Sequence, residues 1–86
     1  MSVKLIRLSQ HARDRLARRG ATEQEIVETI RTAAWQSAEL ERIECRKVFP
    51  YHGLWNNRRY TRKEVRPIFV EGHMEIVVIT VYVYYA

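Results

Sequence analysis

The chain has 86 residues, which suffice for one small domain and exclude a second hydrophobic core. Its 15 Lys and Arg residues outnumber the 10 Asp and Glu residues, which gives a net charge of +5. Twelve of the fifteen cations are Arg, whose planar guanidinium group binds phosphate bidentately. The charge therefore indicates an anionic partner, such as nucleic acid or an acidic protein, unless it serves only to keep the protein soluble.

The residues that bind metals or form disulfides are few. The single cysteine, Cys45, excludes an internal disulfide and a cysteine-rich zinc site. The histidines lie far apart, at positions 11, 52 and 73, so we expect neither a metal ion nor a cofactor. The apolar segment 74–86 is too short to cross a bilayer as a helix, and residues 1–8 do not resemble a signal peptide. We therefore expect a cytoplasmic protein without a membrane partner.

Two helices are predicted in the first half of the chain. The first spans residues 9–19, with Ser9 as its N-terminal cap and Gly20 as its terminator. The second spans residues 23–34 and begins with the capping-box pattern Thr22-Glu23-Gln24-Glu25. Beside the buried face of the first helix runs a stripe of polar side chains, which consists of His11, Arg15 and Arg18.

Alternating polar and apolar residues predict strands in the second half of the chain. We expect strands over residues 40–49, 64–70 and 74–85, with an irregular segment over residues 50–63. Pro67 favours an edge position or a bulge for the second of these strands. The last strand is apolar on both faces, which indicates a central position in the sheet. The side chains expected to face the helices are Val77, Ile79, Val81 and Val83. Its other face would carry Val78, Thr80, Tyr82 and Tyr84.

These elements predict a single α+β domain over residues 1–86. The two N-terminal helices would pack on one face of a three- to four-stranded antiparallel sheet. The last two strands would form a hairpin around the turn Glu71-Gly72-His73. The opposite face of the sheet would be partly open and would carry arginines and aromatic residues.

The histidine of the first helix stands among arginines, a combination that suits the metal-independent cleavage of RNA. His11, with an ordinary pKa of about 6.5, can act as a general base or a general acid. Arg15 and Arg18 can stabilise the negative charge that develops around phosphorus. Alternatively, His11 only borders the buried face of the helix, and the arginines are solvated.

Hydroxyl groups on the last strand and cations in the central segment extend this interpretation. Thr80, Tyr82 and Tyr84 can orient phosphate or stack a base, although Thr and Tyr also simply favour strands. Cations interleaved with Trp55 and Tyr60 suit single-stranded nucleic acid. The candidate substrate-binding cations of this part of the chain are Arg58, Arg59, Arg62, Lys63 and Arg66. The same stretch fits a solvated loop or a docking surface for an acidic protein equally well.

The two ends of the chain together resemble one family. The segment from Leu8 to Gly20, followed by Thr22 and Glu25-Ile26, resembles the opening of the DUF4258 family, and Val77–Tyr82 is similar to its closing strand. That family is in turn similar to the RelE/BrnT-like toxin ribonucleases, which cleave RNA without a metal and are often neutralised by an antitoxin. The resemblance implies a RelE/BrnT-like fold and, at the matching positions, functional roles for His11, Arg15, Arg18 or Arg19, Thr80 and Tyr82.

The leading hypothesis is therefore a ribonuclease that is the toxin of a toxin–antitoxin pair. His11 would act as general base or acid, Arg15 and Arg18 would stabilise the phosphorane, and Tyr82 or Tyr84 would orient the substrate. The rival hypotheses are a non-catalytic RNA-binding or protein-interaction module and a structural homodimer formed through the Pro67 strand. Catalysis requires the His11 ring and the Tyr82 hydroxyl to open onto a common groove. Opposite faces of the sheet would separate them by about 10 Å or more, unless His11 lies at a helix end or at a sheet edge.

Overall fold

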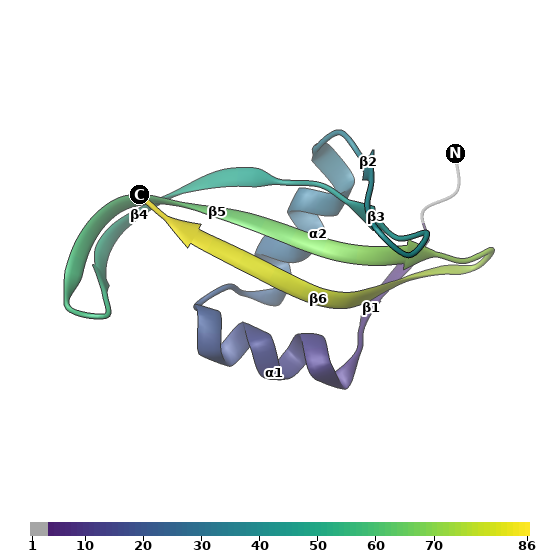
Figure 1. Cartoon of the computed structure of the whole chain (residues 1–86), viewed down its shortest axis with the longest axis horizontal. Coiled ribbons are helices and arrows are strands. Elements are labelled where there is room, and N and C mark those ends of the chain that lie inside the picture. Colours follow the sequence, from purple (N-terminus) through teal and green to yellow (C-terminus); the bar gives the residue numbers. More distant parts are fainter. Residues whose placement is uncertain (1–3) are drawn as a thin grey trace.

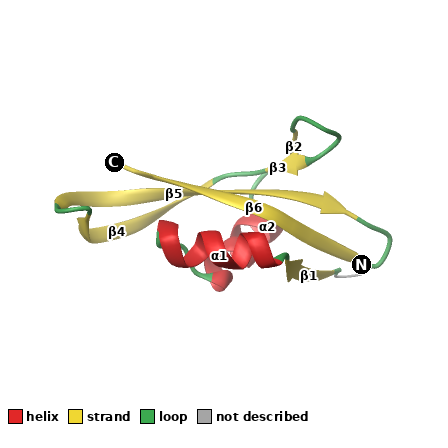
Figure 2. Cartoon of the chain, turned by 60° about the horizontal axis from the view of Figure 1, so that its bottom comes forward, coloured by secondary structure: helices red, strands yellow, loops and turns green. Residues whose placement is uncertain are grey.

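The chain forms one mixed β-sheet with two helices against one of its faces (Figure 1), in a computed structural model that describes residues 4–86. In chain order, the elements are β1 (Leu5–Leu8), α1 (Gln10–Arg19), α2 (Glu23–Thr32), β2 (Gln36–Ser37), β3 (Ile43–Glu44), β4 (Lys47–Trp55), β5 (Arg58–Glu71) and β6 (Glu75–Tyr85). The molecule is elongated, with extents of 42 × 25 × 22 Å, because the β4–β5 hairpin extends beyond the helices (Figure 2).

The sheet is larger than the three- to four-stranded antiparallel sheet expected from the sequence, and that prediction is wrong. Residues 4–86 contain six strands in the order β1-β6-β5-β3-β2, with β4 also paired to β5. β1 runs parallel to β6, whereas the other pairs are antiparallel, so the sheet is mixed. Both helices nevertheless lie against the same face, and the β2–β3 connection lies on the opposite side (Figure 2).

The missed strands are short or lie beside turns. β1 has four residues, and β2 and β3 have two each, too few for an alternating pattern to stand out. Residues 50–63, expected to be irregular, form most of the β4–β5 hairpin, whose turn residues Asn56 and Asn57 both have positive φ. Leu40 and Glu41, expected within a strand, form the turn between β2 and β3 and also have positive φ.

The sequence favoured an edge position or a bulge at Pro67. The residue lies on an interior strand, so the edge position is wrong, and a register shift with β6 follows it between Ile68 and Phe69. β5 pairs with β6 along one side; along the other it pairs with β4 as far as Val65 and with β3 from Ile68. Pro67 falls between these two partners, where its missing N–H interrupts neither ladder. β5 is therefore paired on both sides over residues 63–65 and 68–69, so Pro67 does not offer the open edge that the homodimer hypothesis used, and the homodimer itself stays a hypothesis.

Side-chain caps define the ends of both helices. The Ser9 hydroxyl accepts a hydrogen bond from the Ala12 N–H (3.1 Å), and α1 ends at Gly20 in the left-handed conformation. Thr22 and Glu25 form the reciprocal capping box of α2. α2 ends at Thr32, two residues earlier than expected, as the backbone extends at the following residue. No helix within residues 4–86 has both the length and the apolar character needed to cross a membrane.

A bulge in β6 sets which of its side chains face the helices. The β5–β6 register shifts between Ile68 and Phe69, so Ile79 is an extra residue on β6. Val78 is consequently fully buried in the core, although it was expected on the opposite face. Beyond the bulge the expected alternation holds, with Val81 buried in the core between helices and sheet. The other fully enclosed or nearly enclosed core residues include Leu8, Ala12, Ile26, Ile30, Val65 and Phe69.

Two long side chains fasten the corner between α1 and α2 to the end of the sheet. The Lys63 ammonium donates to the Gly20 carbonyl (2.7 Å) and pairs with the Glu25 carboxylate (2.9 Å). The Tyr85 hydroxyl donates to the Arg19 carbonyl (2.7 Å). These contacts satisfy carbonyls at the end of α1 that have no partner within the helix.

An aromatic cluster joins the projecting hairpin to the same corner. The Tyr85 ring stacks on Trp55 with centroids 4.8 Å apart, and the rings of Tyr51 and Tyr60 lie 5.0 and 5.5 Å from it. A methyl group on Gly20 would lie only 2.8 Å from a ring carbon of Trp55. The close approach of rings and backbone therefore requires glycine at this position.

Candidate nucleic-acid interface

The face of the sheet opposite the helices carries the polar side chains of β6. Because the bulge at Ile79 resets the alternation, Thr80 and Tyr82 line this open face while Val81 between them is buried. Arg66 on β5 lies directly across from Tyr82 in the strand register. The sequence prediction that these side chains share one face therefore agrees with their positions.

Arginine and tyrosine side chains stack on one another across this face. The Arg66 guanidinium carbon lies 5.1 Å from the Tyr82 ring centroid and 5.7 Å from that of Tyr84. Arg19, at the end of α1, reaches the same Tyr82 ring at 4.9 Å and donates to the Val81 carbonyl (3.1 Å). Such contacts hold the cations in place without neutralising them. We call Arg19, Arg66, Tyr82 and Tyr84 the arginine–tyrosine ladder.

A pocket of about 660 Å³ opens beside the ladder, between the sheet and the β2–β3 connection. Its walls come from β3, β5, β6 and the residues around the β2–β3 turn. They comprise Ser37, Ala38, Glu39, Leu40, Arg42, Glu44, Arg66, Ile68, Thr80 and Tyr82. Three of these, Arg66, Thr80 and Tyr82, were candidate site residues in the sequence. Because Arg66 and Tyr82 also belong to the ladder, the pocket and the ladder form one continuous surface.

The pocket contains a loosely paired guanidinium and carboxylate. The Arg66 Nε lies 3.5 Å from Glu44 Oε2, and the Arg46 Nη2 lies 3.9 Å from Glu44 Oε1, the other oxygen of the same carboxylate. The Arg66 Nε is buried yet makes no hydrogen bond with any residue from 4 to 86. A buried donor without an acceptor costs about 1–3 kcal/mol, so the contact between Arg66 and Glu44 is not an optimised hydrogen-bonded ion pair.

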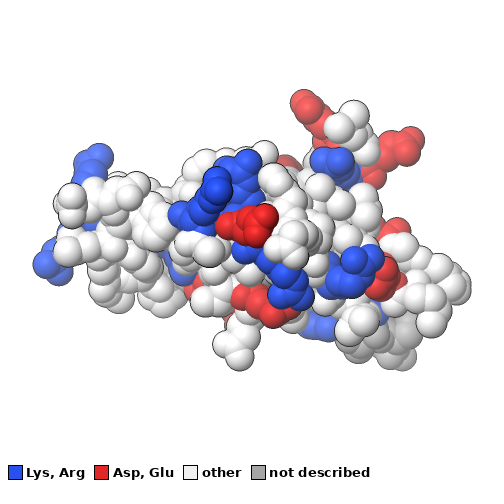
Figure 3. Space-filling model, turned by 90° about the horizontal axis from the view of Figure 1, so that it is seen from below, with Lys and Arg blue, Asp and Glu red and all other residues white. Residues whose placement is uncertain are grey.

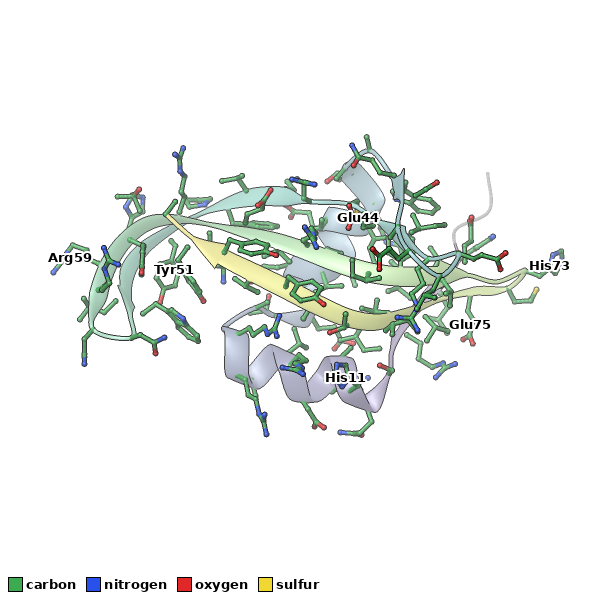
Figure 4. All side chains as sticks on the ribbon, viewed as in Figure 1. His11, Glu44, Tyr51, Arg59, His73 and Glu75 are labelled. Atoms are coloured by element: carbon green, nitrogen blue, oxygen red, sulfur yellow. The ribbon has the colours of Figure 1, made fainter. Side chains whose placement is uncertain are left out.

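His11 and its neighbouring arginines lie elsewhere, on the surface of α1. His11 is exposed, and its Nε2 accepts a hydrogen bond from the Arg15 Nε at 3.3 Å. Arg18 is also exposed. No hydrogen bond, ion pair or ring contact within residues 4–86 joins His11 to Tyr82, and α1 lies in the helix layer beside β6 (Figures 1 and 4). Of the residues predicted on the first helix, only Arg19 reaches the open face.

The cations of the β4–β5 hairpin divide into two groups. Arg58, Arg59 and Arg62 are exposed, and Arg59 points outward near the end of the hairpin (Figure 4). Lys63, predicted to bind substrate, is instead only 6% exposed and is held by Gly20 and Glu25. The strand alternation that exposes Arg62 turns Lys63 inward, which the high density of charge in this segment concealed.

Ion pairs neutralise the basic residues unevenly. Glutamates lie within 4 Å of the ammonium or guanidinium groups of Lys4, Arg7, Arg13, Arg46, Lys47, Lys63 and Arg66. Within residues 4–86 no such pair involves the three cations Arg15, Arg18 and Arg19 at the second half of α1, or the three on the hairpin, Arg58, Arg59 and Arg62. The view from below shows basic groups over the helix side and at the hairpin end, interrupted by acidic ones (Figure 3). The excess positive charge therefore lies at two places, on the second half of α1 and on the β4–β5 hairpin.

Glu44 and the β2–β3 connection are the parts of the site that the sequence did not reveal. Glu44 lies between Arg42 and Arg46 on the polar side of an alternating segment, and this pattern was its only signal. Cys45, next to it, is buried, and burial, aided by the nearby Glu44 charge, raises the pKa of its thiol to about 11. Little thiolate exists at neutral pH, so Cys45 is a core residue rather than a nucleophile.

Comparisons with known proteins identify no relative: no family model, no curated protein and no solved structure matches the chain. The resemblance to the DUF4258 family and to toxin ribonucleases therefore stays a prediction. Residues 4–86 also contain no cluster of three or more His, Cys, Asp or Glu side chains positioned to hold a metal ion.

Proposed function

We propose that this protein binds single-stranded RNA across the open face of its sheet. The observation that carries the proposal is the arginine–tyrosine ladder, in which Arg19 and Arg66 both lie against the ring of Tyr82. Cations that track a phosphate backbone, interleaved with rings that stack bases, are the usual means of binding single strands. The ladder brings rings and cations together on one surface: Arg19 makes no ion pair within residues 4–86 and can meet a phosphate, whereas Arg66 faces Glu44 in the adjoining pocket.

The ladder supplies separate groups for bases and for phosphates. Tyr84 is 48% exposed, so its ring is accessible to an unstacked base. Arg19 makes no ion pair within residues 4–86 and would attract the phosphates, as would the exposed hairpin cations Arg58, Arg59 and Arg62. Trp55 and Tyr60, expected from the sequence to stack bases, instead pack on Tyr85 and support the hairpin.

Binding is favoured over cleavage by the position of His11. A ribonuclease needs its base or acid within hydrogen-bond reach of the phosphate that the other groups hold. His11 contacts Arg15 on α1, whereas Tyr82 contacts Arg19 and Arg66 on the open face. The ribonuclease, the toxin role and the antitoxin partner accordingly remain predictions from the resemblance.

Fluorescence anisotropy with labelled single-stranded RNA tests the proposal. We expect Tyr84→Ala to weaken binding by about 1–3 kcal/mol, the usual worth of one base stacked on an aromatic ring. Arg19→Gln should reduce the dependence of log K on log salt by about 0.7, since one phosphate contact is lost. The matched control is Arg31→Gln, because Arg31 lies on α2 and its side chain makes one hydrogen bond within residues 4–86, to the Lys4 carbonyl (3.5 Å).

Two results would contradict the proposal. One is the absence of RNA binding at low salt, and the other is an equal loss of affinity in Arg19→Gln and Arg31→Gln. The same samples, incubated with EDTA and analysed on denaturing gels, report cleavage. Cleavage by the wild type that His11→Ala abolishes would favour the ribonuclease over the binding module.

A further inference from the structure

We propose that the pocket beside the ladder receives one unpaired guanine base of the bound RNA. This inference rests on the proposed RNA binding and names the base that the surface would select. The observation behind it is the adjacent guanidinium of Arg66 and carboxylate of Glu44 on the pocket wall, 3.5 Å apart.

The size and walls of the pocket suit a base rather than a single ion. Its volume of about 660 Å³ lies within the range of small-molecule sites, roughly 300–1,000 Å³. Ile68 and the ring of Tyr82 provide apolar surface, and Thr80 adds a hydroxyl. Apolar walls with a few convergent polar groups are typical of pockets that orient a planar ligand.

The charges of the pocket favour a neutral ligand over a phosphate. Arg42 and Arg66 are balanced by Glu39 and Glu44, all of which line the pocket. A phosphate placed against Arg66 would also approach the Glu44 carboxylate, and like charges at that distance repel. A base with both donors and acceptors on its edge can satisfy the two side chains together.

Guanine matches this pair better than the other three bases. Its O6 and N7 accept hydrogen bonds, and arginine donates to them in the commonest specific base contact. Its adjacent N1–H and N2–H groups both donate, so that one carboxylate can accept from the two. Adenine and cytosine offer a single amino group beside a ring acceptor, which a carboxylate would repel, and uracil offers no amino group.

The pocket rim is held in shape before any ligand arrives. The turn between β2 and β3 is closed by backbone hydrogen bonds from Ala38 to the Arg42 carbonyl (2.8 Å) and from Arg42 to the Glu39 carbonyl (3.2 Å). β3 pairs with β5 through Glu44 and Ile68, which fixes the Glu44 backbone beside Arg66. A preorganised pocket spends less free energy on ordering and so discriminates better between ligands.

Calorimetric titration with the four nucleoside monophosphates tests the specificity of the pocket. We expect GMP to bind about 5- to 150-fold more tightly than AMP, CMP or UMP, as one good pair of base-specific hydrogen bonds provides. Glu44→Gln keeps the side-chain shape and should abolish this preference. The matched control is Glu64→Gln, because Glu64 also contacts Arg46 (3.9 Å) but does not line the pocket. Equal affinity for GMP and AMP, or loss of the preference in both variants, would overturn the inference.

Labelled oligonucleotides separate this inference from the proposed function. We expect an oligouridine carrying one guanine to bind more tightly than oligouridine alone, and Glu44→Gln to remove the difference. Equal binding of the two oligonucleotides would overturn the guanine pocket and leave RNA binding intact. Absence of binding to either, with GMP selectivity retained, would overturn the proposed function while supporting the specificity of the pocket.

Discussion

The helix-covered face of the sheet and its open face are built from the same two long strands, β5 and β6, yet their chemistry differs. On the covered face, Val65, Phe69, Val78 and Val81 are fully buried beneath the helices. On the open face, arginine and tyrosine side chains contact one another and remain partly exposed. One strand pair can therefore supply both stability and binding, because its alternation assigns the two tasks to opposite sides. Mutations on the two faces should accordingly affect different measurements.

The largest difference should come from truncating one ring on each face. Phe69→Ala removes a fully buried ring that also meets Trp35 edge-on at 5.0 Å, and we expect a loss of about 3–5 kcal/mol in the free energy of unfolding. Tyr84→Ala removes a half-exposed ring and should cost less than about 1 kcal/mol. Urea denaturation followed by circular dichroism measures both. If Phe69→Ala does not fold, Phe69→Leu should still lose more free energy of unfolding than Tyr84→Ala, although the difference will be smaller. Similar losses of stability for the variants on the two faces would contradict the comparison.

The next largest effect should distinguish two adjacent cations of β5. Lys63→Met leaves the Glu25 carboxylate and the Gly20 carbonyl without their shared partner, and we expect a cost of about 3 kcal/mol. Arg62→Met removes an exposed charge and should change stability by less than about 0.5 kcal/mol. Chemical denaturation of the two variants side by side tests the difference. Recovery of stability in the double variant Lys63→Met/Glu25→Gln would confirm that the loss comes from the Glu25 charge, which keeps its hydrogen bond from Thr22 but lacks a counter-ion.

A smaller effect is expected from adding a methyl group at the helix corner. Gly20 has a φ of 79°, and a Cβ there would press on the Tyr85 hydroxyl and on Trp55, so Gly20→Ala should cost about 1–3 kcal/mol. Gly53→Ala is the matched control, because a Cβ at Gly53 meets the Tyr51 ring at an ordinary 3.5 Å. Thermal denaturation compares the two. Equal melting temperatures for Gly20→Ala and the wild type would show that the corner is not tightly packed.

The smallest effect concerns the hydrogen bond from Tyr85 and its dependence on pH. Burial, with contributions from Tyr51 and Glu25, raises the pKa of Tyr85 to about 12, above the ordinary value of 10. The folded state therefore holds this proton more tightly than the unfolded state. The stability that Tyr85 contributes should be complete below pH 10 and should decline as the pH rises toward 12. Tyr85→Phe should cost about 1 kcal/mol at neutral pH, and its difference from the wild type should narrow above pH 10 in urea titrations. A difference that stays constant up to pH 12 would contradict this explanation.

The sequence predicts the local features of this fold better than its connections between distant segments. Ser9, Gly20 and the Thr22–Glu25 capping box act within one turn of the chain, so their effects can be read directly from residue order. The pairing of β1 with β6 joins residues about 70 positions apart and depends on only four residues. The bulge at Ile79 is equally hidden, because nothing in the run Val77–Val81 marks one residue as extra.

The candidate site was predictable only where it depends on local residue order and not on the packing of distant segments. Thr80, Tyr82 and Tyr84 share a face by simple alternation, whereas the approach of Arg19 and Arg66 to Tyr82 depends on how α1 and β5 pack. The inward turn of Lys63 depends on a partner at the far end of α1. The place of Glu44 in the site depends on the pairing of β3 with β5, which puts its carboxylate beside Arg66.

The central position of β6 has a consequence for the synthesis of the protein. β6 pairs with both β1 and β5, yet it follows every other described element in the chain. A nascent chain that has reached only Glu71 therefore lacks the strand on which β1 and α1 dock, and its apolar residues stay exposed. Translation products that stop before Glu75 should be bound by chaperones or degraded by proteases, so that the domain folds only after β6 has left the ribosome.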